Sequence, residues 1–122
     1  MKEPIGGNVR EQPSLLDRTA SGAALRRVFE SEEIGLFHFA LGSRPVRIGH
    51  EQLVSLILCL EGRAVLSDEG DDRVLEGGNY AVVREGETCE LAAHGAAAEV
   101  LLFVGFEQLP GAFFNSYGPA NV

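Results

Sequence analysis

The fold of this 122-residue chain is decided by residues 53–93, which read LVSLILCLEGRAVLSDEGDDRVLEGGNYAVVREGETCELAA. Short apolar runs alternate here with polar clusters that contain glycine, a rhythm that predicts strands separated by turns. Residues 63–66 and 73–75 flank the polar cluster 67–72, which predicts a β-hairpin. The run 53–60 is the longest apolar stretch and predicts a buried strand.

The same alternation extends from residue 27 to residue 106. We expect about eight to ten short strands and no long helix, a spacing typical of antiparallel sandwiches and barrels. Three segments are therefore expected: an N-terminal arm (1–26), a β-barrel (27–107) and a C-terminal tail (108–122). The arm carries no sustained period, although residues 22–28 could form a short helix.

The strand expected over residues 53–60 is apolar on both faces. By alternation, Ile57 and Cys59 share one face with Ser55, and the other face carries Val54, Leu56, Leu58 and Leu60. Antiparallel sheets usually expose one face to water, so a strand of this kind needs a second cover. We expect that cover to be a partner subunit in a homodimer. The terminal segments are the alternative, since the tail carries three aromatic residues.

Composition narrows the function classes. The chain is 45% hydrophobic and 23% charged, which excludes global disorder. Its net charge of −8 argues against a nucleic-acid partner. No apolar stretch approaches the roughly 20 residues of a membrane span, and the first residues lack a secretory signal pattern. We therefore expect a cytoplasmic protein whose two cysteines are free thiols.

The spacing of four glycines is the most specific pattern in the chain. Gly42 is followed by five residues, Ile48-Gly-His50, four residues, Ser55, six residues and Gly62. Gly78 is followed by five residues, Arg84-Glu-Gly86, two residues, Cys89, three residues and Ala93. Fifteen residues separate Gly62 from Gly78. In this spacing the chain resembles the two motifs of the cupins, which implies a jelly-roll β-barrel, also described as a double-stranded β-helix.

The resemblance also shows where the chain departs from the family. Cupin enzymes hold a divalent metal with two histidines and a glutamate of the first motif and a histidine of the second. Those positions are occupied here by Ile48, His50, Ser55 and Cys89. Isoleucine cannot ligate a metal and a neutral serine ligates zinc or iron poorly, so we expect no metal cofactor. The alternative is a rebuilt transition-metal site that contains His50 and Cys89, completed by His38, His94, Glu51 or Glu90.

The resulting functional prediction is a metal-free barrel that binds a small molecule of unknown identity. The expected pocket residues are Arg47, Ile48, His50, Ser55, Ile57, Arg84 and Cys89. The arginines in this set would orient a carboxylate or phosphate. The alternative is a cupin enzyme of the isomerase, epimerase or oxygenase type, with His50 as acid or base or paired with Cys89. A regulatory dimer with a filled barrel, or the sensing half of a transcription regulator, is also compatible with the sequence.

Overall fold

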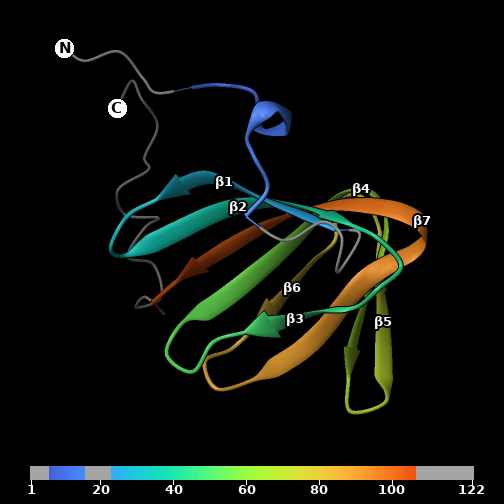
Figure 1. Cartoon of the computed structure of the whole chain (residues 1–122). Coiled ribbons are helices and arrows are strands. Elements are labelled where there is room, and N and C mark those ends of the chain that lie inside the picture. The colour runs from blue at the N-terminus through green and yellow to red at the C-terminus, as the bar shows by residue number, and fades with distance from the viewer. Residues whose placement is uncertain (1–5, 16–22, 107–122) are drawn as a thin grey trace, which may run out of the picture.

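The computed structural model describes residues 6–15 and 23–106, so the expected tail lies outside the described residues. A single turn of 3₁₀ helix, η1 (Val9–Glu11), precedes the strands and is the only helical element of the described part. The strands in chain order are β1 (Ala24–Glu30), β2 (Ile34–Leu41), β3 (Val46–Gly49), β4 (Val54–Asp68), β5 (Asp71–Leu75), β6 (Tyr80–Val83) and β7 (Thr88–Gly105) (Figure 1). The all-β prediction is confirmed.

Two long, bent strands organise the fold. The first half of β4 pairs with the second half of β7, and the second half of β4 pairs with the first half of β7. The register shifts between Cys59 and Glu61 and again between Gly62 and Ala64. A first layer therefore contains β1, β2, the end of β7, the start of β4, and β6. A second layer contains β3, the start of β7, the end of β4, and β5. Figure 1 shows the curvature of β7.

The number of strands differs from the prediction of eight to ten. Seven strands are present in the described residues, because the chain continues through two expected breaks. The Glu61-Gly62 dipeptide is an irregularity inside β4, and Gly62 adopts a φ of +72° there. Bulges bend a strand without ending it, so the glycine marks a bend. The predicted hairpin is confirmed, since Ala64 pairs with Leu75 and Asp68 with Asp71.

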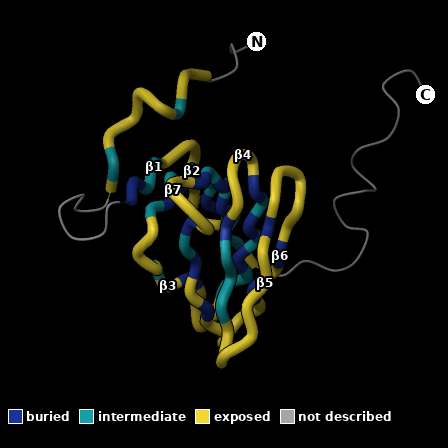
Figure 2. The backbone as a smooth tube through the Cα atoms, turned by 90° about the vertical axis from the view of Figure 1, so that its right-hand side faces the viewer, coloured by how far each residue is buried: buried dark blue, intermediate teal, exposed yellow. Residues whose placement is uncertain are grey.

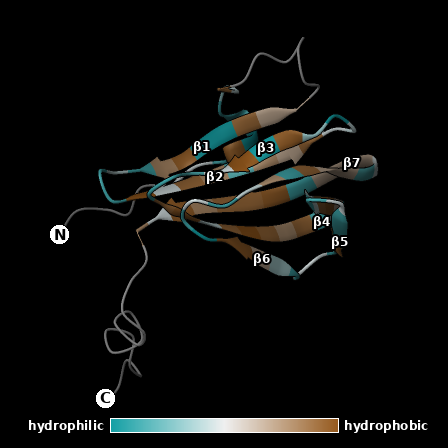
Figure 3. Ribbon diagram, turned by 90° about the horizontal axis from the view of Figure 1, so that it is seen from below, coloured by the Kyte–Doolittle hydropathy of each residue, from teal (hydrophilic) through white to brown (hydrophobic). Residues whose placement is uncertain are grey.

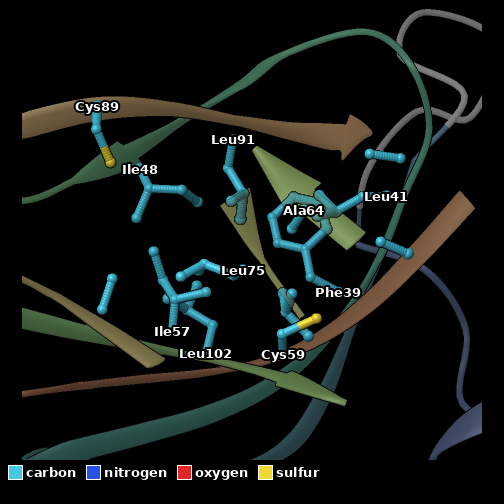
Figure 4. Packing of buried hydrophobic residues seen from close by; sticks show 14 of the residues in the cluster. Phe39, Leu41, Ile48, Ile57, Cys59, Ala64, Leu75, Cys89, Leu91 and Leu102 are labelled. Atoms are coloured by element: carbon cyan, nitrogen blue, oxygen red, sulfur yellow. The ribbon is translucent and has the colours of Figure 1, made fainter. Parts of the chain in front are cut away.

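The core lies between the two layers. Phe39 and Ile57 enter it from the first layer, and Leu75 and Leu91 enter from the second (Figure 4). Val100 on β7 belongs to the same cluster. Ile57, Leu91 and Val100 are completely buried. Figure 2 shows the buried segments enclosed by exposed turns and edges. Sheet faces packed in this way are stabilised mainly by removal of apolar surface from water.

Apolar side chains lie on the outer side of the first layer on four strands. Figure 3 shows the hydropathy of the residues along these strands. Neighbouring residues on this side form two rows. We call their apolar members the outer face: Leu36, Phe103, Leu56 and Val82 in one row, and Leu101, Leu58 and Tyr80 in the other, which begins at His38 on β2. Tyr80 and Val82 are exposed, and the other five side chains are partly exposed.

The N-terminal segment (residues 6–15) runs beside β1. Ser14 forms an isolated bridge with Arg26, and the Leu15 amide donates to the Leu25 carbonyl at 2.7 Å. The alternative of a short helix over residues 22–28 is wrong, because β1 begins at Ala24, before the expected arm boundary at residue 26. Pairing with β2 from Ala24 to Glu30 outweighs the weak local preference of this segment.

Candidate functional site

Four of the expected pocket residues point into the interior. Ile48 on β3 and Cys89 on β7 are register partners, and both are buried. Ser55 and Ile57 on β4 are 2% and 0% exposed. Figure 4 shows the side chains of Ile48, Ile57 and Cys89 directed toward one another. This part of the expected pocket is packed with its own side chains.

His50 lies elsewhere, in the exposed loop after β3. Its Nδ1 accepts a hydrogen bond from the Gln52 amide at 2.9 Å, and its carbonyl accepts one from the Gly86 amide at 2.9 Å. Both contacts fix the loop. Gly49 precedes it with a φ of +143°, and an added Cβ there would collide with the backbone of Glu87. The close approach of β3 to the turn before β7 therefore requires a glycine.

An open cleft of about 570 Å³ lies at the end of the fold where the β4–β5 hairpin faces β3 and the β6–β7 turn. Its lining residues are mostly polar: Arg47, Ser67, Asp68, Glu69, Gly70, Gly86, Glu87, Thr88, Cys89 and Glu90. We call this space the mouth cleft. A second cleft of about 500 Å³ shares Asp68, Glu87, Thr88 and Cys89 with it and continues toward β5 and β6. Arg84 is exposed and lines neither cleft.

The mouth cleft is negatively charged. Four carboxylates line it beside one guanidinium, that of Arg47. Two of them, Asp68 and Glu69, belong to the tip of the β4–β5 hairpin, residues 68–72, which we call the acidic hairpin tip. The register pairs Ser67 with Glu90, so the tip lies next to the start of β7. Sequence reasoning missed this because the tip alone has the composition of a solvated turn, and its neighbour is 20 or more residues further along the chain.

Cys89 forms the floor of the mouth cleft and is 8% exposed. Burial, together with the negative charges of Asp68 and Glu87, raises the pKa of its thiol to about 11. Burial also raises the pKa of Cys59, whose Sγ lies 3.6 Å from the Gly62 carbonyl oxygen. The thiol is the weakly reactive and weakly ligating form of cysteine, so the site holds Cys89 in a form unsuited to nucleophilic chemistry at neutral pH.

Comparisons with known proteins place the fold. No protein-family profile and no curated protein matches this sequence. Among solved structures, a predicted oxalate decarboxylase from Thermotoga maritima superposes with a TM-score of 0.71 at 15% identity, over 84% of this chain and 100% of the other. The cupin domain of Cnp3 from Schizosaccharomyces pombe superposes with a TM-score of 0.69 at 9% identity, over 88% and 72% of the two chains.

This chain has the cupin fold. The expected jelly-roll architecture is thereby confirmed. An HTH_3 family transcriptional regulator from Vibrio cholerae also matches, with a TM-score of 0.61 at 14% identity over 70% of this chain. The present chain spans about half of that regulator's length, 52%. Proteins with different activities share this fold, so the likeness shows architecture and leaves the activity to the site.

The residues present do not fit the divalent metal of cupin enzymes. Ile48 offers no donor atom, burial disfavours the thiolate form of Cys89, and the Nδ1 of His50 is engaged by a backbone amide. Within residues 6–15 and 23–106, no three His, Cys, Asp or Glu side chains gather in a group that could hold a metal ion. The same residues include no helix long and apolar enough to cross a membrane.

Proposed function

We propose that this cupin-fold chain is a small-molecule-binding module without a catalytic metal, and that its ligand occupies the mouth cleft. One observation carries the proposal: three of the family's four ligand positions are occupied by the buried side chains of Ile48, Ser55 and Cys89, while an open polar cleft lies directly outside Cys89. Its volume of about 570 Å³ falls within the range of small-molecule pockets.

The charge of the cleft favours a cationic ligand. Asp68, Glu69, Glu87 and Glu90 surround a space whose only lining cation is Arg47. A carboxylate or phosphate ligand, which the arginines alone would suggest, meets an excess of like charge there. Charge-assisted hydrogen bonds from an ammonium or guanidinium group to these carboxylates are the stronger interaction. We therefore propose a small organic amine as the ligand class.

Thermal shift and calorimetric titration test the ligand class with spermidine as cationic probe and citrate as anionic probe. Spermidine should raise the melting temperature of the wild-type chain, because a ligand that binds only the folded state stabilises it. The double variant Asp68→Asn/Glu87→Gln should lose this shift. Glu32→Gln, an exposed carboxylate outside both clefts, is the matched control and should retain it.

Two results would overturn the proposal. One is stabilisation by citrate with no response to spermidine in the wild-type chain. The other is a transition metal near one per chain that survives chelator dialysis, measured by elemental mass spectrometry on tag-free protein. The enzyme alternative gains no support from the site, because Cys89 is protonated and His50 serves its own loop.

We also propose that the outer face binds a second copy of this chain. Its seven side chains include no charged group, whereas the chain as a whole carries a net charge of −8. Four strands span roughly 20 Å, and a standard interface of about 800 Å² per partner is roughly 28 Å across if it is square. The face is therefore the right size for the apolar centre of a homodimer interface, with surrounding polar residues as its rim.

Light scattering during size-exclusion chromatography tests the dimer at micromolar concentration. The wild-type chain should have twice the monomer mass, and Leu58→Glu at the centre of the outer face should have the monomer mass. Val74→Glu is the matched control, since Val74 is 45% exposed on β5 of the second layer. A monomeric wild-type chain would overturn the dimer.

A further inference from the structure

His38 is an unusual residue to find on the outer side of the first layer. It is 1% exposed, and neither ring nitrogen makes a well-formed hydrogen bond with any residue in the described ranges. Its Nε2 lies 3.2 Å from Oε1 of Glu99, in close contact without hydrogen-bond geometry. A buried polar group without partners costs free energy, so the arrangement calls for a physical explanation.

The N-terminal segment is attached over this histidine. Arg10 donates from both Nε and one terminal nitrogen to the Glu99 carboxylate, at 3.3 and 2.9 Å. Arg26 on β1, the register partner of His38, donates from Nε to the Gln12 carbonyl at 3.1 Å. Figure 1 shows η1 on the side of β1 and β2. The segment is thus held by the two side chains that stand next to the His38 ring, Arg26 and Glu99.

We infer that His38 makes docking of the N-terminal segment sensitive to pH, so that protonation of its ring releases the segment from β1 and Glu99. The charged groups that face the ring are Arg26 from β1, Arg10 from η1 and Glu99 from β7. Glu61 on β4 adjoins Glu99. An imidazolium would meet two cations and compete with Arg10 for the one carboxylate that anchors the segment.

The direction of the effect follows from the pKa of His38. Burial lowers it from its ordinary value of 6.5, Arg26 and Arg10 also lower it, and Glu99 opposes them. A histidine whose pKa is lowered in the docked state stabilises that state above pH 6.5 and loses the contribution as the pH falls below that value. The hydrogen bond from Arg10 lowers the pKa of Glu99 below 4.5, so this carboxylate stays charged throughout the histidine transition.

Hydrogen exchange of the Leu15 amide, measured by NMR on the full chain, tests the inference. This amide donates to Leu25 and reports docking. Its protection factor, corrected for intrinsic exchange, should fall about tenfold or more from about pH 7.5 to about pH 5. His38→Gln, which cannot be protonated in this range, should show no such fall. His94→Gln, which alters an exposed histidine of β7, should behave like the wild-type chain.

Constant protection in the wild-type chain, or an equal fall in His38→Gln, would overturn the inference. Circular dichroism checks that the His38 variant folds. If it does not fold, the ring of His38 is titrated by NMR in the wild-type chain. The pH midpoint of the loss of Leu15 protection should then coincide with the pH midpoint of the His38 ring titration. A midpoint of Leu15 protection below pH 4.5, where Glu99 titrates, would assign the release to Glu99 and overturn the role of His38.

Discussion

At the scale of single residues, burial decides what the side chains of this site can do. Cys89 occupies a position that the family uses for a metal-ligating histidine, yet its thiol is held in the protonated form. His50 keeps a family residue type, but its ring accepts a backbone hydrogen bond in an exposed loop. The identity of a residue at a family ligand position therefore does not fix what it can do. Its reactivity depends on its surroundings, buried for Cys89 and exposed for His50.

Thiol labelling with Ellman's reagent checks the state of Cys89. In a Cys59→Ala background at about pH 8, the native chain should react about a hundredfold more slowly than an unstructured thiol, because a pKa near 11 replaces an ordinary value of 9.0. The unfolded chain in urea is the control and should react at the ordinary rate. Equal rates in the two states would show that Cys89 is an accessible thiol with an ordinary pKa.

The same residue predicts a loss of stability in alkali. A thiol whose pKa is raised by folding stabilises the native state below pH 9.0, and this contribution is lost as the pH rises from 9.0 through about 11. Urea unfolding at a series of pH values should therefore show a steeper alkaline decline for the wild-type chain than for Cys89→Ala. Parallel declines in the two chains would contradict the raised pKa.

At the scale of elements, the bend in β4 is what creates two layers from one pair of long strands. Gly62 lies at the bend with a φ of +72°, and an added Cβ would come within 2.6 Å of the Ala97 carbonyl oxygen. Gly70, in the β4–β5 turn, also has a positive φ of +90°, but open space surrounds it. An alanine at Gly70 would therefore cause backbone strain alone, whereas an alanine at Gly62 would cause the same strain and also collide with β7.

Gly62→Ala should lower the free energy of unfolding by about 3 kcal/mol, because left-handed backbone strain adds to displacement of β7. Gly70→Ala carries only the backbone strain and should cost about 1 kcal/mol. Chemical denaturation followed by circular dichroism measures both. Equal losses of unfolding free energy for the two substitutions would show that β7 moves away from the added Cβ at little cost. The close approach of β7 to Gly62 would then not be what requires a glycine at the bend.

At the scale of the whole molecule, β4 and β7 belong to both layers, so neither layer can unfold without disturbing the other. The single core contains side chains from six of the seven strands, β2 to β7. A fold connected in this way should unfold in one cooperative transition. The N-terminal segment is attached only at its margin and is able to detach separately.

Ile57→Ala tests this cooperativity and the importance of the core. Ile57 is completely buried between the layers, so its truncation should cost about 2–5 kcal/mol while preserving a single transition. Leu60→Ala, on the same strand but 40% exposed, should cost less than about 1 kcal/mol. Two separate transitions in urea, seen with different probes, would contradict a shared core.

The amino-acid sequence by itself determined the fold class, the β4–β5 hairpin and the cupin resemblance, because alternation of apolar residues and glycine spacing are local patterns. Only the tertiary structure decided that Ile48, Ser55 and Ile57 are core residues and that His50 faces outward. The same holds for the acidic hairpin tip beside Cys89 and for the histidine beneath Arg10. These contacts join residues far apart in the chain, and long-range packing against a bent strand leaves no periodic signal in one sequence.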